Sequence, residues 1–158
     1  MTKNFFEIKN STFAASKKNK VIDFNLNIKE AGEIVCLLGP SGVGKTTILR
    51  SIAGLQKIEK GEILLKGNLL SSEHFHIEPE KREIALSFQD NSLFPHYNVI
   101  DNINFGAKRN SNSNDKIDLN ELLDVLHIRN LIMKFPHQIS AGEAQRVSLA
   151  RSLMSSPE

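Results

Sequence analysis

The sequence predicts an α/β protein with a core of parallel strands, and three observations carry this prediction. Residues 33–38 (EIVCLL) form an apolar run of strand length without polar alternation, as is typical of a strand covered on both faces. A glycine-rich loop follows directly. Apolar residues then recur at helical spacing from Ile48 to Ala53. A strand, a tight loop and a helix in this order form the unit from which parallel sheets are built.

The remaining elements fall on either side of residue 97. Before it, residues 21–28 alternate as a half-exposed strand with Ile22, Phe24, Leu26 and Ile28 on one face, and residues 60–68 and 83–90 read as two further strands. After it, residues 107–116 read as an exposed polar loop. Leucines at positions 119, 122, 123 and 126 predict an amphipathic helix, and a last helix begins near Ser140. We therefore predict a β-rich core over 1–97 and a helical lobe over 98–158.

The composition excludes several classes of protein. The 158 residues carry a net charge of +2 without a concentrated basic stripe, so we expect no nucleic-acid partner. No run of about 18 apolar residues is present, and the N-terminus lacks the apolar core of a signal peptide. The single cysteine, Cys36, lies in the apolar run and is predicted to be a buried strand residue of a cytoplasmic protein.

The glycine-rich loop matches G-x-x-x-x-G-K-[ST] in full, with Gly39, Gly44, Lys45 and Thr46 at the four defined positions. Such glycines let backbone N–H groups turn inward at a helix N-terminus, where they bind phosphate. Lys45 would reach the β- and γ-phosphates, and Thr46 would offer its hydroxyl to Mg²⁺. An ordinary glycine turn before a helix is the alternative, which the preceding strand and following helix disfavour. The predicted contacts are Gly39, Pro40, Ser41, Gly42, Val43, Gly44, Lys45, Thr46 and Thr47.

Three long segments of the sequence, one of which contains this loop, resemble a known protein family. They are LLGPSGVGKTTILRSIAGL (37–55), IALSFQDNSLFPHYNVIDNINFGAK (84–108) and HQISAGEAQRVSLARSLMSSPE (137–158). In this order they resemble the phosphate loop, glutamine loop and signature of the ATP-binding cassette (ABC) subunits of membrane transporters, particularly bacterial importers. The resemblance implies an α/β phosphate-loop NTPase fold with an N-terminal antiparallel β subdomain and a helical lobe.

The resemblance also implies roles for residues outside the loop. Phe13 would stack on adenine, and Gln89 would contact Mg²⁺ and the attacking water. The signature residues would touch the γ-phosphate of ATP held by a second cassette in a head-to-tail dimer; they are Ser140, Ala141, Gly142 and Glu143. From residue type alone, Ser140 and Glu143 form a capping box. The family's leucine, first glycine and glutamine are replaced here by Ile139, Ala141 and Glu143.

The expected partners follow from the same resemblance. The apolar stretch after Gln89, with Leu93, Phe94, Tyr97 and Val99, would dock a transmembrane permease subunit. A solute-binding protein would be an indirect partner, and the chain would lie on the cytoplasmic face of the plasma membrane. The block layout is most similar to cassettes for ferric iron, polyamines, sulfate or maltose, of which we favour iron.

Phosphoryl transfer needs a carboxylate for Mg²⁺ and usually a second one for water. In cassettes these follow a run of four apolar residues as Asp-Glu, a pattern absent from the 158 residues. We therefore expect the N-terminal part of a cassette that ends before this motif, binds ATP and hydrolyses little of it alone. A soluble non-transport cassette and a degenerate nucleotide-sensing module remain alternatives. His74 and His76, two residues apart, could form a metal pair, but no carboxylate or cysteine cluster accompanies them.

Overall fold

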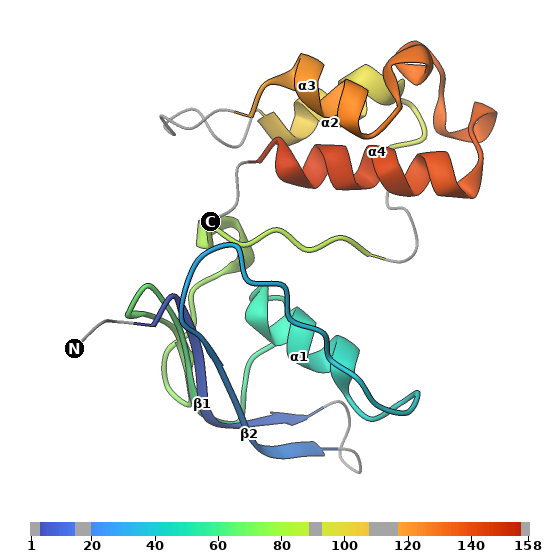
Figure 1. The fold of residues 1–158 in the computed structure, drawn as a ribbon. Coiled ribbons are helices and arrows are strands. Elements are labelled where there is room, and N and C mark those ends of the chain that lie inside the picture. The colour runs from blue at the N-terminus through green and yellow to red at the C-terminus, as the bar shows by residue number, and fades with distance from the viewer. Residues whose placement is uncertain (1–3, 15–19, 89–92, 108–116, 156–158) are drawn as a thin grey trace. The chain divides into compact units, whose positions relative to one another are not determined.

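The computed structural model describes residues 4–14, 20–88, 93–107 and 117–155. The chain divides into two compact units, Met1–Ile84 and Ala85–Glu158, whose elements are labelled in Figure 1. Each unit has its own hydrophobic core. The boundary at residues 97 and 98 that we predicted lies inside the second unit.

The first unit is built on a four-stranded antiparallel sheet of order β2-β1-β3-β4. Its strands are β1 (Phe6–Ala14), β2 (Lys20–Ile28), β3 (Lys60–Leu65) and β4 (Asn68–Ser72). The N-terminal antiparallel sheet implied by the family resemblance is thus confirmed. Its core consists of apolar side chains from the sheet, from the helix between β2 and β3, and from the connection before β3: Phe6, Ile8, Phe13, Ile48, Ile58, Ile63, Leu65 and Leu70.

Strand β2 differs from the predicted alternation at one point. Ile22 and Asp23 together oppose a single residue of β1, and Asp23 has a left-handed φ of 51°. This bulge reverses the facing of the strand start, because an extra residue shifts every preceding side chain to the other face. Val21 consequently packs on the core, and Ile22 is exposed. The bulge thus brings Val21 to the side on which the glycine-rich loop lies.

The helix after the glycine-rich loop, α1 (Lys45–Ile52), forms as predicted. Ile48 is buried in the sheet core, and Ala53 caps the last turn. Gly54 follows with φ of 81°, the left-handed conformation in which glycine commonly ends helices.

Two predicted strands are wrong. Residues 33–38 form no strand; Ile34 is 94% and Leu38 91% exposed, and Cys36 is exposed rather than buried. Residues 83–88 are likewise not a strand. A strand needs hydrogen-bonded neighbours, and in the described part of the chain the sheet offers these segments none. Of these two apolar segments, Leu37 and Ile84 pack on the sheet core, whereas Ile34 and Leu38 remain exposed.

The second unit is helical. It contains α2 (Val99–Ala107), α3 (Leu119–Val125) and α4 (Ala141–Leu153), with short 3₁₀ turns at Arg129–Leu131 and Pro136–Gln138; a further 3₁₀ turn, Pro79–Lys81, belongs to the first unit. Helices α2 and α4 approach closely at Gly106, where a Cβ would lie 2.0 Å from the Arg151 carbonyl oxygen. The predicted helix at 119–126 is confirmed, with Leu122 and Leu123 buried. The predicted polar loop at 107–116 lies, apart from Ala107, outside the described residues.

Candidate nucleotide-binding site

The glycine-rich loop runs into the first turn of α1 in a conformation that depends on glycine. Gly42 and Gly44 have φ of 81° and 107°, which L-residues rarely adopt. Gly44 is the N-cap of α1, and no side chain caps the helix. The first N–H groups of a helix have no partner within it, so they remain free to bind an anion. The first turn of α1 holds no acidic residue that would oppose a phosphate.

Lys45 lies at the start of α1 and folds back over the loop. Its Nζ donates to the carbonyl oxygens of Gly39 and Pro40, both at 2.8 Å. These neutral acceptors hold the ammonium group beside the loop without neutralising its charge. A phosphate oxygen would be a stronger, charge-assisted acceptor for the same group.

The two threonines after Lys45 differ in exposure. Thr46 is exposed, so its hydroxyl is accessible to a metal ion, whereas the Thr47 side chain is buried. Thr47 can therefore serve a ligand only through its main-chain N–H. The site fits a triphosphate with Mg²⁺ for three reasons. The helix start is uncapped, the Lys45 ammonium keeps its positive charge, and the Thr46 hydroxyl is accessible.

Phe13 is placed differently from the prediction. The ring is 0% exposed and makes an edge-to-face contact with Phe24 at a centroid distance of 6.0 Å. Register shifts in β1 around Ser11 turn this side chain into the sheet core. A fully buried ring offers no face to a base, so this arrangement supports a packing role and does not support adenine stacking.

The signature segment forms the N-terminus of α4 in the second unit. Ser140 Oγ accepts from the Glu143 N–H at 3.3 Å, and Glu143 Oε2 accepts from the Ser140 N–H at 2.7 Å. This is the predicted capping box, which is confirmed. Ser140, Ala141 and Gly142 are exposed, and a Cβ on Gly142 would meet nothing within 4 Å. The helix start is therefore accessible to a ligand.

Glu143 also binds the hydroxyl of Ser140. Ser140 Oγ donates to Glu143 Oε2 at 2.8 Å. The Ser140 N–H and hydroxyl lower the pKa of Glu143 below its ordinary value, so the side chain is a carboxylate at neutral pH. In this arrangement the hydroxyl proton of Ser140 is directed at Glu143 and is not available to a phosphate.

Gln89 lies outside the described residues, and the stretch that follows it is described from Leu93. There Phe94 makes edge-to-face contacts with Tyr97 and Phe105 at 5.6 and 4.7 Å between centroids, and Arg151 lies over the Phe94 ring at 5.2 Å. Of the predicted docking residues, Leu93, Phe94 and Tyr97 are partly exposed, whereas Val99 is fully buried in the core of the second unit and has no surface to offer a partner.

Asn102 fixes this stretch and was missed by the sequence analysis. Its side chain is fully buried; Oδ1 accepts from the Phe94 N–H at 2.8 Å, and Nδ2 donates to the carbonyls of Phe94, Tyr97 and Asn98 at 3.0–3.1 Å. Asn102 is a polar residue on the otherwise apolar face of α2, and this position could have indicated a buried side chain with hydrogen-bond partners. Arg82 was also missed, because it lies between the charged residues Lys81 and Glu83 and nothing in this local sequence indicates burial.

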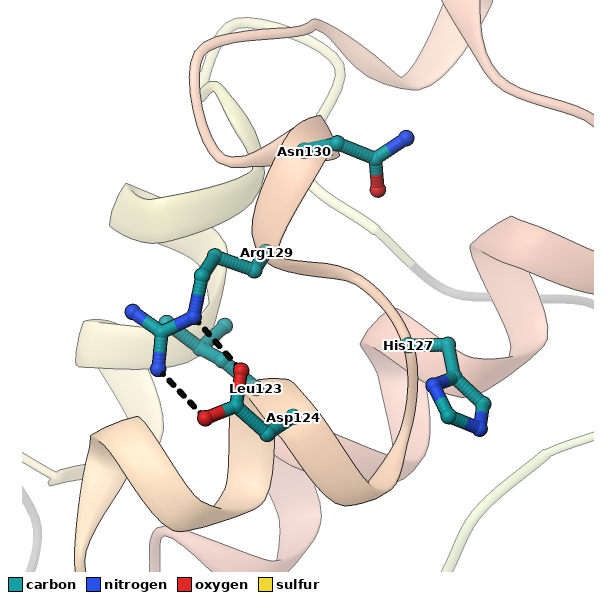
Figure 2. A pocket seen from close by; sticks show the side chains of 5 residues that line it. All are labelled: Leu123, Asp124, His127, Arg129 and Asn130. Atoms are coloured by element: carbon teal, nitrogen blue, oxygen red, sulfur yellow. Dashed lines mark hydrogen bonds and ion pairs between the residues drawn. The ribbon is translucent and has the colours of Figure 1, made fainter.

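A separate hollow of about 380 Å³ opens on the second unit and is lined by Leu123, Asp124, His127, Arg129 and Asn130 (Figure 2). Arg129 donates two hydrogen bonds to the Asp124 carboxylate, from Nε to Oδ1 at 2.6 Å and from Nη2 to Oδ2 at 2.9 Å. This pairing lowers the pKa of Asp124 and raises that of Arg129. The two charges neutralise each other, and the hollow contains none of the predicted site residues.

The described residues contain no group of three or more His, Cys, Asp or Glu side chains that could hold a metal ion. Both ring nitrogens of His76 already have protein partners, namely the Gly54 carbonyl, Ser71 and Arg82. Across the same described part of the chain, no helix has the length and apolarity needed to cross a membrane.

The comparison with protein families decides the assignment. The sequence model described as "ABC transporter" matches residues 21–158. The chain belongs to the ABC transporter family.

Relatives within the ABC transporter family include the Fe(3+) ions import ATP-binding protein FbpC 2 of Haemophilus influenzae, 42% identical over 87% of this chain and 38% of the relative. The maltose/maltodextrin import ATP-binding protein MalK of Mannheimia succiniciproducens is 41% identical over 86% of this chain and 36% of the relative. The chain thus spans less than half the length of these ABC relatives.

Solved ABC structures share the fold. CbiO1 from Clostridium perfringens, part of the ABC transporter complex cbiONQ, aligns with a TM-score of 0.76 and 27% identity over 98% of this chain and 63% of its own. The ATP-binding cassette MJ0796, in a dimeric post-hydrolysis state bound to ADP and Pi, aligns with a TM-score of 0.75 and 26% identity over 96% and 70%. The predicted α/β cassette fold is confirmed.

Proposed function

We propose that this chain binds Mg·ATP at the glycine-rich loop and acts as the energy-coupling ATP-binding subunit of a membrane importer. The observation that carries the proposal is the loop itself: an uncapped start of α1, glycines with positive φ, and Lys45 held beside it, in a chain of the ABC transporter family. The similarity to importer ATP-binding proteins over 84–96% of this chain supports the transport role.

Residues 39–47 would hold the triphosphate through main-chain N–H groups and the Lys45 ammonium, with Thr46 and Gln89 contributing to Mg²⁺ binding. When bound, Mg²⁺ supplies charge neutralisation for the phosphates. Adenine binding by Phe13 is not part of the proposal, because the buried ring has no free face.

The partners follow from the accessible surfaces. Residues 140–143 at the start of α4 would contact ATP held by a second cassette, and the dimeric ATP-binding cassette MJ0796 supports such an assembly. The partly exposed residues after Gln89, Leu93, Phe94 and Tyr97, would dock a permease subunit, and the chain would then lie at the cytoplasmic face of the plasma membrane. A solute-binding protein would take part indirectly.

Ferric iron is the solute we propose, in line with the FbpC relatives at 42% identity. Relatives named for spermidine/putrescine, maltose and sulfate are 39–42% identical, so uptake assays with each of these solutes and with ferric iron are the test of this choice. The 158 residues contain no Asp-Glu pair after an apolar run, and we propose that they bind ATP with little steady-state hydrolysis.

A nucleotide-sensing module is the second candidate function. It is favoured by Glu143, which engages the hydroxyl proton of Ser140 and adds a negative charge where a partner's phosphate would lie. Association with permease subunits in the presence of Mg·ATP distinguishes the two, because an energy-coupling subunit would bind them and a sensing module would not.

Titration with Mg·ATP, followed by calorimetry, tests the proposal. We expect saturable binding by the unaltered chain and at least about tenfold weaker binding by Lys45→Ala, a loss of about 1.4 kcal/mol. Lys57→Ala is the matched control, because Lys57 is exposed and lies outside the loop. Equal affinities of the Lys45 and Lys57 variants would contradict the proposed site.

A further inference from the structure

Arg82 is a buried cation without a carboxylate among its described hydrogen-bond partners. Only 6% of the residue is exposed. Burial lowers the pKa of Arg82 to about 10, opposed by the nearby charge of Glu78, so the guanidinium remains charged at neutral pH. A buried charge is costly unless its donors are all used. The hydrogen bonds of this side chain therefore show what it is placed to hold.

The guanidinium joins three segments of the first unit. Nη1 donates to the Ser51 and Ile52 carbonyls, the last two of α1, at 2.9 and 2.7 Å. Nη2 donates to the Leu70 carbonyl and the Ser71 hydroxyl of β4 at 3.1 and 2.5 Å, and Nε donates to the Ile77 carbonyl at 2.8 Å. A positive charge at the C-terminal end of a helix also interacts favourably with the helix dipole.

His76 completes the same network. One ring nitrogen, Nε2, lies 3.0 Å from the Gly54 carbonyl oxygen and must donate to it. The other, Nδ1, is therefore the unprotonated acceptor, 3.3 Å from both Arg82 Nη2 and Ser71 Oγ. His76 thus covers a further carbonyl beyond α1 and orients the guanidinium.

Gly54 leaves room for this arrangement. A Cβ at this position would lie 2.6 Å from Arg82 Nε and 3.0 Å from its Cδ. The chain turn after α1 and the buried guanidinium are consequently packed directly against each other, and neither can shift without the other.

The network lies at the opposite end of α1 from the phosphate loop. Helix α1 has eight residues and a length of about 12 Å, so displacement of its C-terminal end tilts the N-terminal turn that carries Lys45 and Thr46. Arg82 also lies two residues before Ile84, the last residue of the first unit. One side chain therefore fixes the end of the nucleotide helix from a position close to the end of the first unit.

We infer that Arg82, oriented by His76, is a positioning residue for nucleotide binding: it holds α1 so that the phosphate loop keeps its binding conformation. The inference rests on the proposed function, since it presumes that the loop binds Mg·ATP. It predicts that breaking the network weakens ATP affinity in a chain that is still folded.

The test compares Mg·ATP dissociation constants of variants of the 158-residue chain under conditions where denaturation curves show each variant to be folded. We expect Arg82→Met to weaken binding at least about tenfold, or about 1.4 kcal/mol. Arg82→Lys should remain weakened, because one ammonium group cannot replace the planar fork of donors. Arg50→Met is the matched control for charge, since Arg50 is an exposed cation in the last turn of the same helix.

A second control separates positioning from general stability. Leu65→Ala removes a buried core side chain from β3 and should lower the midpoint of unfolding while leaving the dissociation constant unchanged. If Arg82→Met does not fold, His76→Leu provides the same test and His76→Gln, which keeps a donor and an acceptor, should restore affinity. Affinity unchanged in the folded Arg82 or His76 variants would overturn the inference.

The outcomes distinguish this inference from the proposed function. Absence of saturable Mg·ATP binding by the unaltered chain would refute both. Binding that is lost in Lys45→Ala but retained in Arg82→Met would refute the role of Arg82 alone. An equal loss of affinity in Leu65→Ala and Arg82→Met would also refute it, because the effect would then follow stability.

Discussion

Gly44 and Val21 provide a quantitative test of the phosphate-loop geometry. Replacement of Gly44 by alanine would place a Cβ 2.5 Å from Val21 Cγ2, in a residue with φ of 107°. The positive φ alone costs about 1–2 kcal/mol for an L-residue, and a forced contact in a packed region costs about 1–3 kcal/mol. We therefore expect Gly44→Ala to lower the free energy of unfolding of the first unit by about 2–5 kcal/mol.

Gly42→Ala is the matched control in the same loop. Gly42 also has a positive φ, 81°, but a Cβ there would meet nothing within 4 Å. Gly42→Ala should lower the free energy of unfolding only by the cost of the positive φ, about 1–2 kcal/mol. The entropy lost by the unfolded chain on replacing glycine with alanine is the same at both positions and cancels in the comparison.

Val21→Ala then isolates the contact. Removal of Cγ2 leaves Val21 Cβ, 3.9 Å from the new Cβ, as the nearest atom of this side chain. In the double variant Gly44→Ala/Val21→Ala, the steric part of the cost should disappear, giving a coupling free energy of about 1–3 kcal/mol. Urea denaturation followed by circular dichroism measures all four species. Equal costs at Gly42 and Gly44, or strict additivity in the cycle, would refute the reasoning.

Two further predictions concern the second unit. Asn102→Ala should destabilise it by about 2–4 kcal/mol, because the Phe94 N–H and the Tyr97 carbonyl lose their side-chain partner, whereas the Phe94 and Asn98 carbonyls keep main-chain donors. The near-UV circular dichroism of Tyr97, the only tyrosine in a chain without tryptophan, should change, and an unaltered spectrum would contradict this. The pKa of Glu143 is lowered by its bonds to Ser140, so the ionised side chain contributes stability above pH 4.5 that is lost as the pH falls through its folded-state pKa. The Glu143→Gln variant should therefore lose less stability on acidification than the unaltered chain. If the free energy of unfolding of the two proteins depends on pH in the same way, the capping box is not the cause of the pH dependence.

Local patterns in the sequence determined much of the fold. Strands β2 and β3, helices α1 and α3, and the capping box that starts α4 follow from neighbouring residues: alternation, helical spacing and capping side chains are properties of short segments. The phosphate loop belongs to the same class, since its glycines and Lys45 act within one turn of chain. For the helices, the capping box and the phosphate loop the sequence was sufficient, because the interactions that form them are local. For β2 and β3 the sequence indicated the strand, and the pairing with β1 came from the fold.

Tertiary structure decided the features that depend on distant partners. The apolar run at residues 33–38 carries a strand pattern, but hydrogen bonds to neighbouring strands make a strand, and the described sheet supplies none. Phe13 lies in the core because of the register of β1, and Arg82 and Asn102 bind carbonyls that sequence spacing does not bring near them. The sequence gives the chemistry of a charged or polar side chain. Which backbone groups that side chain hydrogen-bonds depends on where the fold places those groups.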